Sequence, residues 1–247
     1  MCSTCFSRRG FLASAFAAPL AVSGCDEAPI LVSDEQAAQM GQEAWDQIIA
    51  NTPVSRDSTY NSALKRISGG LLQAAGVNSE GWEVAVFESD QINAFALPGG
   101  KIGVYEGMFG VTQNDAQLAA IVGHEIGHLQ AEHAQKRISA QIAKDAGIRI
   151  VAFFLNMGGV EYGREIAAAL GVGVDVGLLL PYSRNQELEA DALGLRTMAS
   201  AGYDPQAAVA LWEAMQAASE GRPPEFLATH PTPRSRIREI EEILTTL

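Results

Sequence analysis

Residues 115–128 read Asp-Ala-Gln-Leu-Ala-Ala-Ile-Val-Gly-His-Glu-Ile-Gly-His, and this stretch decides how the rest of the chain is interpreted. The run of apolar residues before the first histidine predicts a helix buried on most sides. His124 and His128 lie about 40° apart around such a helix, so both imidazoles face one side. Glu125 is turned by about 100° from His124, where it can act on a water molecule beside a metal ion without binding the ion. The stretch predicts a metal-binding helix, and the alternative is two core histidines with an unrelated glutamate between them.

Two histidines need a third protein ligand before they can hold a catalytic zinc ion. His133 is the nearest in sequence, but a continuing helix places it off the ligand face, so we expect it to be exposed. Glu187 and Asp191 share one face of a helix expected at 184–200, so one could bind the metal while the other accepts the outer N–H of a ligand histidine. Glu189 points the other way and is expected to be solvated. Spacing alone fits a solvated acidic face equally well.

Composition excludes several classes of function. The chain has 247 residues, 47% of them hydrophobic and 19% charged, which predicts one compact domain with a sizeable core. The net charge is −12, from 17 Lys and Arg against 29 Asp and Glu. Nucleic-acid binding is therefore excluded, because phosphate contacts need clustered cations. The three cysteines are Cys2, Cys5 and Cys25, which excludes a disulfide framework or a thiolate metal site in the folded part.

Periodicity along the chain predicts an α+β fold, mostly helical, with a small sheet of about three strands before the metal-binding helix. Helices are expected over 33–51, 60–75, 115–144, 184–200, 205–218 and 234–246, and strands over 82–88, 94–97 and 102–105. Ser33 and Gln36 form a capping-box pattern. The apolar segments 148–157 and 166–180 are too short or too interrupted to span a membrane. We expect buried core helices there, and the alternative is a flap or a surface lying against a membrane.

The amino terminus is typical of an export signal. Paired arginines (Arg8 and Arg9), an apolar stretch of about 12 residues and the sequence Val22-Ser23-Gly24-Cys25 follow in order. The last motif resembles a bacterial lipobox, in which Cys25 would be lipidated. We expect a twin-arginine-type lipoprotein signal peptide over 1–24 and a single domain over 25–247, on the periplasmic side of the cell envelope. Which membrane holds the anchor is left open, and the alternative is an ordinary first helix of a cytosolic protein.

Four ordered motifs resemble the HtpX-like family of zinc metallopeptidases, which includes the CAAX prenyl proteases and the BepA/LoiP-type lipoprotein proteases. The motifs are Asn-Ala-Phe-Ala-Leu-Pro-Gly-Gly-Lys-Ile (93–102), His-Glu-Ile-Gly-His (124–128), Asn-Gln-Glu-Leu-Glu-Ala-Asp (185–191) and Thr-His-Pro-Thr-Pro-Arg-Ser-Arg-Ile (229–237). The resemblance covers the chain from about Trp82 to its end. It implies a gluzincin-type zinc endopeptidase with one Zn²⁺ per chain in a zincin-type domain. The ligand types alone do not exclude manganese or cobalt.

The resemblance also implies a role for each matching residue. The implied metal ligands are His124, His128 and Glu187, and Asp191 would orient a ligand histidine. The implied general base is Glu125, and His230 would stabilise the oxyanion with Arg234 in support. The residues implied to bind an extended substrate along an edge strand are Asn93, Ala94 and Phe95. The alternative for His230 is a loop histidine without a catalytic role. The alternative for residues 93–97 is an ordinary strand of a hairpin.

The substrate class implied by the resemblance is unfolded or misassembled proteins of the cell envelope. The expected partners are such proteins and, through an anchor at Cys25, a membrane, while fixed protein partners are left open. One alternative is a non-catalytic tethered chaperone or assembly factor with a structural zinc site. Glu125 argues against it, because a structural site gains nothing from a base beside the metal. Another is a peptidase held inactive by part of 148–180 lying over the cleft.

Overall fold

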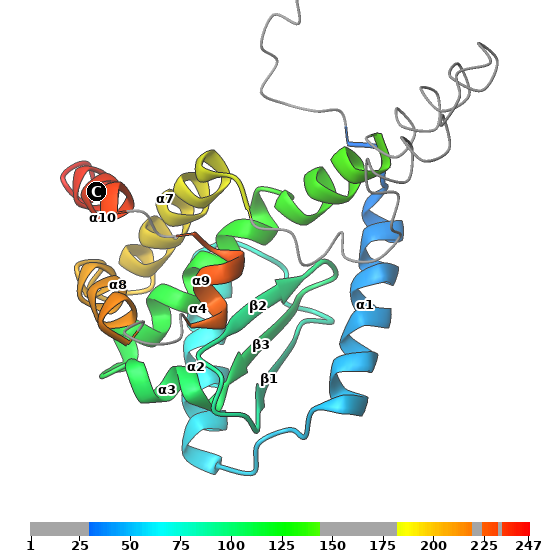
Figure 1. Cartoon of the computed structure of the whole chain (residues 1–247), viewed down its shortest axis with the longest axis horizontal. Helices are drawn as coiled ribbons and strands as arrows, with labels where there is room; N and C mark the ends of the chain where they lie inside the picture. Colours follow the sequence, from blue (N-terminus) through cyan, green and yellow to red (C-terminus); the bar gives the residue numbers. More distant parts are fainter. Residues whose placement is uncertain (1–29, 144–181, 219–223, 232–233) are drawn as a thin grey trace, which may run out of the picture.

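The computed structural model describes residues 30–143, 182–218, 224–231 and 234–247 (Figure 1). The predicted signal peptide, Cys25 and the apolar segments 148–157 and 166–180 lie outside these residues, so the expectations about them stay predictions. Among the described residues, no helix combines the length and the apolar character needed to cross a membrane.

The described elements form the α+β fold predicted from the sequence. The helices are α1 (Asp34–Asn51), α2 (Ser58–Ala74), α3 (Glu106–Val111), α4 (Asp115–Gln130), α7 (Arg184–Ser200), α8 (Ala207–Ala218), α9 (Glu225–Thr229) and α10 (Arg234–Leu244), and residues 133–143 are also helical. The strands are β1 (Glu83–Phe87), β2 (Ala94–Leu97) and β3 (Lys101–Tyr105). The sequence did not predict α3 and α9, because five or six residues are too few for a helical period to be recognised.

The three strands form one mixed sheet in the order β1-β3-β2. β3 runs parallel to β1 and antiparallel to β2. Within the described residues, β2 is paired on one side only, so it is an edge strand. Figure 1 shows α1 beside this sheet, with the helix over 133–143 reaching its upper end, where Ala37 and Ile138 pack together. α1 approaches the β2–β3 turn at Gly41, where an added Cβ would lie 2.0 Å from the carbonyl oxygen of Pro98.

α4 forms the centre of the molecule, as the apolar run in its sequence predicts. Every residue from Gln117 to His128 is buried. Its neighbours in the main core come from α2, β2, α7 and α8. The buried-helix prediction for residues 115–128 is therefore confirmed.

Small residues hold α7 close against α4. A Cβ added at Gly127 would lie 2.6 Å from the carbonyl oxygen of Ala190, and one added at Gly194 would lie 2.8 Å from the carbonyl carbon of Gly123. Real Cβ atoms essentially never come this close to backbone atoms, so any larger residue would force the helices apart. This contact brings the acidic face of α7 onto the histidine face of α4 although about 60 residues separate them in sequence.

The helix predicted over 115–144 is interrupted, so that prediction was wrong at one point. α4 ends at Gln130 with Ala131 as its C-cap, and Glu132 has a φ of +54° before the helix resumes at residue 133. Neither glycine nor proline marks the break, and the residues there favour helices on their own. Periodicity therefore could not reveal it, although it redirects the chain beside the site.

Candidate metal centre and active site

The three predicted metal ligands meet between α4 and α7. Nε2 of His124 lies 3.0 Å from Nε2 of His128. Oε2 of Glu187 lies 3.6 Å from Nε2 of His124, and Oε1 of Glu187 lies 3.4 Å from Nε2 of His128. All three side chains are buried. The structure thus places these residues as one donor set, and the alternative of a solvated acidic face is excluded for Glu187.

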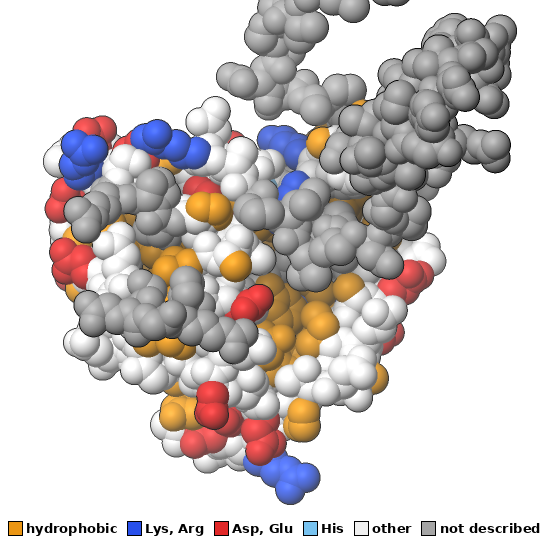
Figure 2. All heavy atoms as spheres, in the orientation of Figure 1, with side chains coloured by type: hydrophobic (Ala, Val, Ile, Leu, Met, Phe, Trp, Pro, Cys, Tyr) orange, Lys and Arg blue, Asp and Glu red, His pale blue; other side chains and the backbone are white. Residues whose placement is uncertain are grey.

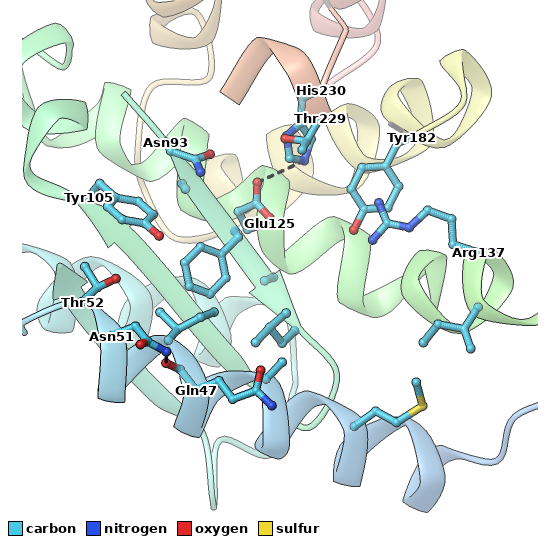
Figure 3. A pocket seen from close by; sticks show the side chains of 18 of the residues that line it. Gln47, Asn51, Thr52, Asn93, Tyr105, Glu125, Arg137, Tyr182, Thr229 and His230 are labelled. Atoms are coloured by element: carbon cyan, nitrogen blue, oxygen red, sulfur yellow. Dashed lines mark hydrogen bonds and ion pairs between the residues drawn. The ribbon is translucent and has the colours of Figure 1, made fainter. Parts of the chain in front are cut away.

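His230 joins the same cluster from the end of α9. One donor atom from each of His124, His128, Glu187 and His230 falls within 4.8 Å of all the others. Nε2 of His230 lies 3.4 Å from Oε1 of Glu125, and Figure 3 shows this pair facing each other above the sheet. The ring of His230 is stacked on Phe226 with centroids 4.2 Å apart, which fixes its plane. Sequence reasoning predicted His230 near the centre, and the structure places it there.

The side chain behind His124 is Asp191, as predicted. Its Oδ1 lies 2.9 Å from Nδ1 of His124. Asp191 in turn accepts hydrogen bonds of 2.7 and 2.8 Å from Nε and Nη2 of Arg236. Arg236 also donates to Glu187 and lies 4.0 Å above the ring of Trp212. The buried Arg236 therefore connects the predicted metal ligand Glu187 with Asp191, which supports the predicted ligand His124.

Arg236 was missed in the sequence, which pointed to Arg234 in the same motif. Arg234 begins α10, and its side chain lies outside what the structure describes. A signal for Arg236 was present: it stands four residues before the buried Ile240, so both lie on the inner face of α10. Buried cations are rare unless they are paired, and this one meets two carboxylates.

His133 is buried, and the prediction that it is exposed was wrong. The break at Glu132 turns the following residues back, so Nδ1 of His133 lies 2.8 Å from Nδ1 of His128. Nε2 of His133 lies 3.2 Å from Oε2 of Glu189. Glu189 is exposed, as predicted, but it is in contact with this histidine. The ring of Tyr182 is stacked on His128 with centroids 3.8 Å apart.

Burial controls the ionisation of the acids around the cluster. It raises the pKa of Glu125 to about 8, against the backbone amide of Ala96 and the positive charges of Arg137 and Arg236. It also raises the pKa of Glu187 to about 8, against Arg236. Burial opposes ionisation of Asp191 as well, but Arg236 and His124 outweigh it and lower the pKa of Asp191 to about 2. Asp191 is therefore ionised at neutral pH.

Burial also lowers the pKa of the histidines. The pKa of His124 falls below its usual value, although Asp191 opposes the shift. Those of His128 and His230 fall well below it, and neighbouring cationic groups lower them further. Neutral imidazole is the form that binds metal ions.

The donor set fits a divalent metal ion. Oε1 of Glu187 is buried and has no hydrogen-bond partner among the described residues, so it is an acceptor that a cation would satisfy. Two imidazoles and a carboxylate are a usual protein ligand set for catalytic zinc, with a further position left for water or substrate. His124, His128 and Glu187 are thus the residues that would hold the ion.

A groove of about 860 Å³ opens beside the cluster. It lies between α1 and edge strand β2, and its lining includes the three residues predicted to bind substrate, Asn93, Ala94 and Phe95. Glu125 and His230 line it too. Figure 2 shows hydrophobic side chains gathered where the groove opens between α1 and the sheet. The reactive residues therefore face a mostly apolar channel.

The profile of Peptidase family M48 matches residues 58–244. The chain belongs to this family. It is 34% identical over 211 residues to the mitochondrial metalloendopeptidase OMA1 of Schizosaccharomyces pombe, an alignment that covers 83% of this chain and 60% of that protein. It is 28% identical over 210 residues to the beta-barrel assembly-enhancing protease of Escherichia coli K12, covering 83% of this chain and 43% of that protein. It is also 30% identical over 220 residues to the OMA1 metalloendopeptidase of Bos taurus, covering 84% and 42%.

Membership of family M48 confirms the predicted resemblance to metallopeptidases at the level of the family. The chain spans 60% of the first relative and less than half of the other two. The site agrees with this family, because a histidine pair and a distant glutamate converge as the ordered motifs predicted.

Proposed function

We propose that this protein is a zinc-dependent endopeptidase. The observation that carries the proposal is the convergence of His124, His128 and Glu187 on one point, with Glu125 beside them and open to the groove. A purely structural metal site has no use for a buried carboxylate that binds no metal and faces a channel. This arrangement favours catalysis over the alternative of a non-catalytic chaperone.

Each reacting residue would have one task. His124, His128 and Glu187 would hold a zinc ion, which would supply Lewis-acid chemistry to the scissile carbonyl and to a water molecule near neutral pH. Glu125 accepts a proton from the attacking water and passes it to the leaving amine. A base whose pKa lies near the working pH suits both transfers. Burial raises the pKa of Glu125, and the positive charges of Arg137 and Arg236 limit the rise to about 8. His230 donates a hydrogen bond to the oxyanion from Nε2.

The substrate would be an extended stretch of unfolded protein. Among the described residues, one edge of β2 has no strand paired with it, so it offers backbone groups to an added strand, and such pairing accepts many sequences. Apolar side chains of α1, among them Met40, Ala44 and Ile48, line the opposite wall. Buried apolar segments become available to such a groove only when a protein is unfolded. Quality control of misassembled envelope proteins fits this chemistry, and the name of the Escherichia coli relative supports it.

We propose further that residues 1–24 are a lipoprotein signal peptide and that Cys25 tethers one domain, 25–247, to a membrane on the periplasmic side. The ordered arginine pair, apolar stretch and lipobox-like motif support this. Replacing Cys25 with Ala should move the expressed protein from the membrane fraction to the soluble fraction and abolish incorporation of labelled fatty acid. Membrane retention of the C25A variant would contradict the anchor.

The activity is tested by degradation of unfolded casein with Glu125→Gln beside the wild type. The substitution keeps the shape of the side chain and removes the base, so the rate should fall by at least about 100-fold. Zinc content by elemental analysis should stay at the wild-type level, since Glu125 is not a ligand. Equal casein degradation by the two proteins would overturn the proposal and favour the chaperone.

His230 is tested in the same assay, because its place in the cluster allows two roles. An oxyanion donor predicts that His230→Ala loses about 100-fold or more in kcat and keeps its zinc affinity. A fourth metal ligand predicts that zinc affinity falls together with activity. Chelator competition for zinc separates the two outcomes.

A further inference from the structure

The support behind His128 is a chain of two side chains that ends at the surface. His128, His133 and Glu189 are joined by contacts of 2.8 Å between the Nδ1 atoms of the histidines and 3.2 Å between Nε2 of His133 and Oε2 of Glu189. His133 is completely buried, while the side chain of Glu189 is 53% exposed. The chain of contacts therefore runs from the metal centre to solvent.

The metal would fix the direction of every proton in this chain. Nε2 of His128 faces His124 and Glu187, so it is the atom that would bind the ion. Nδ1 of His128 must then carry the ring proton and donate it. The acceptor can only be Nδ1 of His133 in its neutral form, which leaves the proton of His133 on Nε2, where Glu189 accepts it.

We propose that His133, aided by Glu189, is a positioning residue for the metal centre. It holds His128 in the tautomer and ring orientation that presents Nε2 to the ion. This inference rests on the proposed function, because it assumes that His128 binds a metal. A histidine in this place differs from the carboxylate that supports His124: it is a neutral acceptor, and Glu189 polarises it from the surface. Such supports of metal ligands typically contribute about 10- to 100-fold to metal affinity.

The backbone break at Glu132 is what makes this arrangement possible. In an uninterrupted helix, His133 would be turned by about 140° from His128. The positive φ of Glu132 starts a new helix whose first residue is His133 and brings its ring back over the end of α4. The aromatic ring of Tyr182 lies against both histidines, with centroids 3.8 Å from His128 and 6.1 Å from His133.

Zinc affinity, measured by competition with a chromophoric chelator, tests the proposal. His133→Leu removes the acceptor at similar volume, and we expect a 10- to 100-fold loss of affinity. In His133→Asn the side-chain oxygen can take the place of Nδ1, so most of the affinity should return. Glu189→Ala should cost a few-fold, while Glu213→Ala, which removes an exposed glutamate from α8, should cost nothing.

A second readout does not depend on how well these variants fold. In the zinc-loaded wild type, ¹⁵N-edited NMR of the imidazoles should show His128 protonated at Nδ1 and His133 protonated at Nε2. Protonation of His133 at Nδ1 would overturn the proposal, and so would a folded His133→Leu variant with wild-type zinc affinity. Wild-type protein that binds no zinc at all would instead overturn the proposed function.

Discussion

His124 and His128 stand one turn apart on α4 and face the same centre, yet different chemistry holds them. Behind His124 stand an ionised aspartate and a buried arginine, both almost completely shielded from solvent. Behind His128 stand a neutral histidine and a glutamate at the surface. The support behind His124 is charged and buried. The support behind His128 begins with the uncharged, buried His133 and ends with Glu189, which is exposed to solvent. The two histidines of one centre are therefore supported in two different ways, and we expect different losses when each support is removed.

The support behind His124 should have the largest effect on stability. Arg236→Met removes the cation between Asp191 and Glu187 and leaves buried carboxylates without it. Breaking a buried pair in this way typically costs about 3–5 kcal/mol. We therefore expect a strong drop in the urea midpoint of the metal-free protein.

The matched control is Arg66→Met, which breaks the exposed pair between Arg66 and Asp115 on α2 and α4. Exposed pairs contribute about 0–1 kcal/mol, so this variant should unfold almost as the wild type does. Equal losses of stability in the two variants would show that the buried ion pairs of Arg236 contribute no more to stability than the exposed pair of Arg66.

Metal removal sharpens the comparison through pH. In the folded, metal-free protein Glu125 and Glu187 keep their protons up to a pKa of about 8, whereas the unfolded chain releases them near 4.5. The cluster histidines have lowered pKa values, so below about pH 7 the unfolded chain binds their protons and opposes this effect. From pH 7 to 8 the histidines are neutral in both states and the two glutamates still hold more protons in the folded state. The stability therefore falls as the pH rises from 7 to 8, by about 2 kcal/mol. Asp191, with its pKa near 2, stays ionised throughout and contributes no change in this range.

Urea unfolding at pH 7 and pH 8, with EDTA or with zinc, measures this effect. Zinc binds the ionised carboxylate, so the stabilisation that zinc gives should be larger at pH 8 than at pH 7. A midpoint of the EDTA-treated protein that is flat or rises across this range would contradict the assignment of the buried protons.

Both supports depend on how closely α7 lies against α4, since Asp191 and Glu189 belong to the same helix. Gly127→Ala places a Cβ 2.6 Å from the carbonyl oxygen of Ala190. The helices must move apart, which should cost about 1–3 kcal/mol and weaken zinc binding about tenfold or more by displacing Glu187. Zinc competition and thermal unfolding measure the two effects.

Gly69→Ala, on the exposed side of α2, is the control for this substitution. An added Cβ there has no atom within 4 Å, and alanine favours a helix over glycine by about 0.5–1 kcal/mol. The control should therefore be slightly more stable than the wild type with unchanged zinc affinity. Zinc affinity that survives in Gly127→Ala would show that the α4–α7 distance does not set the site.

The sequence predicts one of the two supports and misses the other for a physical reason. Asp191 stands four residues after Glu187, so helical periodicity alone puts both on one face, and α7 begins and ends where the capping residues indicate. His133 reaches His128 only because the backbone leaves the helix at Glu132, a position without glycine or proline. Arg236 is intermediate: its spacing to Ile240 indicates the inner face of α10, but its partners come from α7. Local periodicity predicts what shares a face, while contacts created by a break or between distant helices need the structure.

The break itself gives the smallest expected effect. Glu132 has a φ of +54°, a conformation that costs a residue with a Cβ about 1–2 kcal/mol and costs glycine little. Glu132→Gly should therefore stabilise the folded protein slightly, by less than about 1 kcal/mol, because glycine also loses more entropy on folding. Glu132→Ala keeps the strain and changes the charge in the same way, so it is the matched control. If the glycine variant is no more stable than the alanine variant in urea unfolding, the backbone at residue 132 is not strained. His133 would then reach His128 without backbone strain, and the support behind His128, like the one behind His124, would need no strained residue.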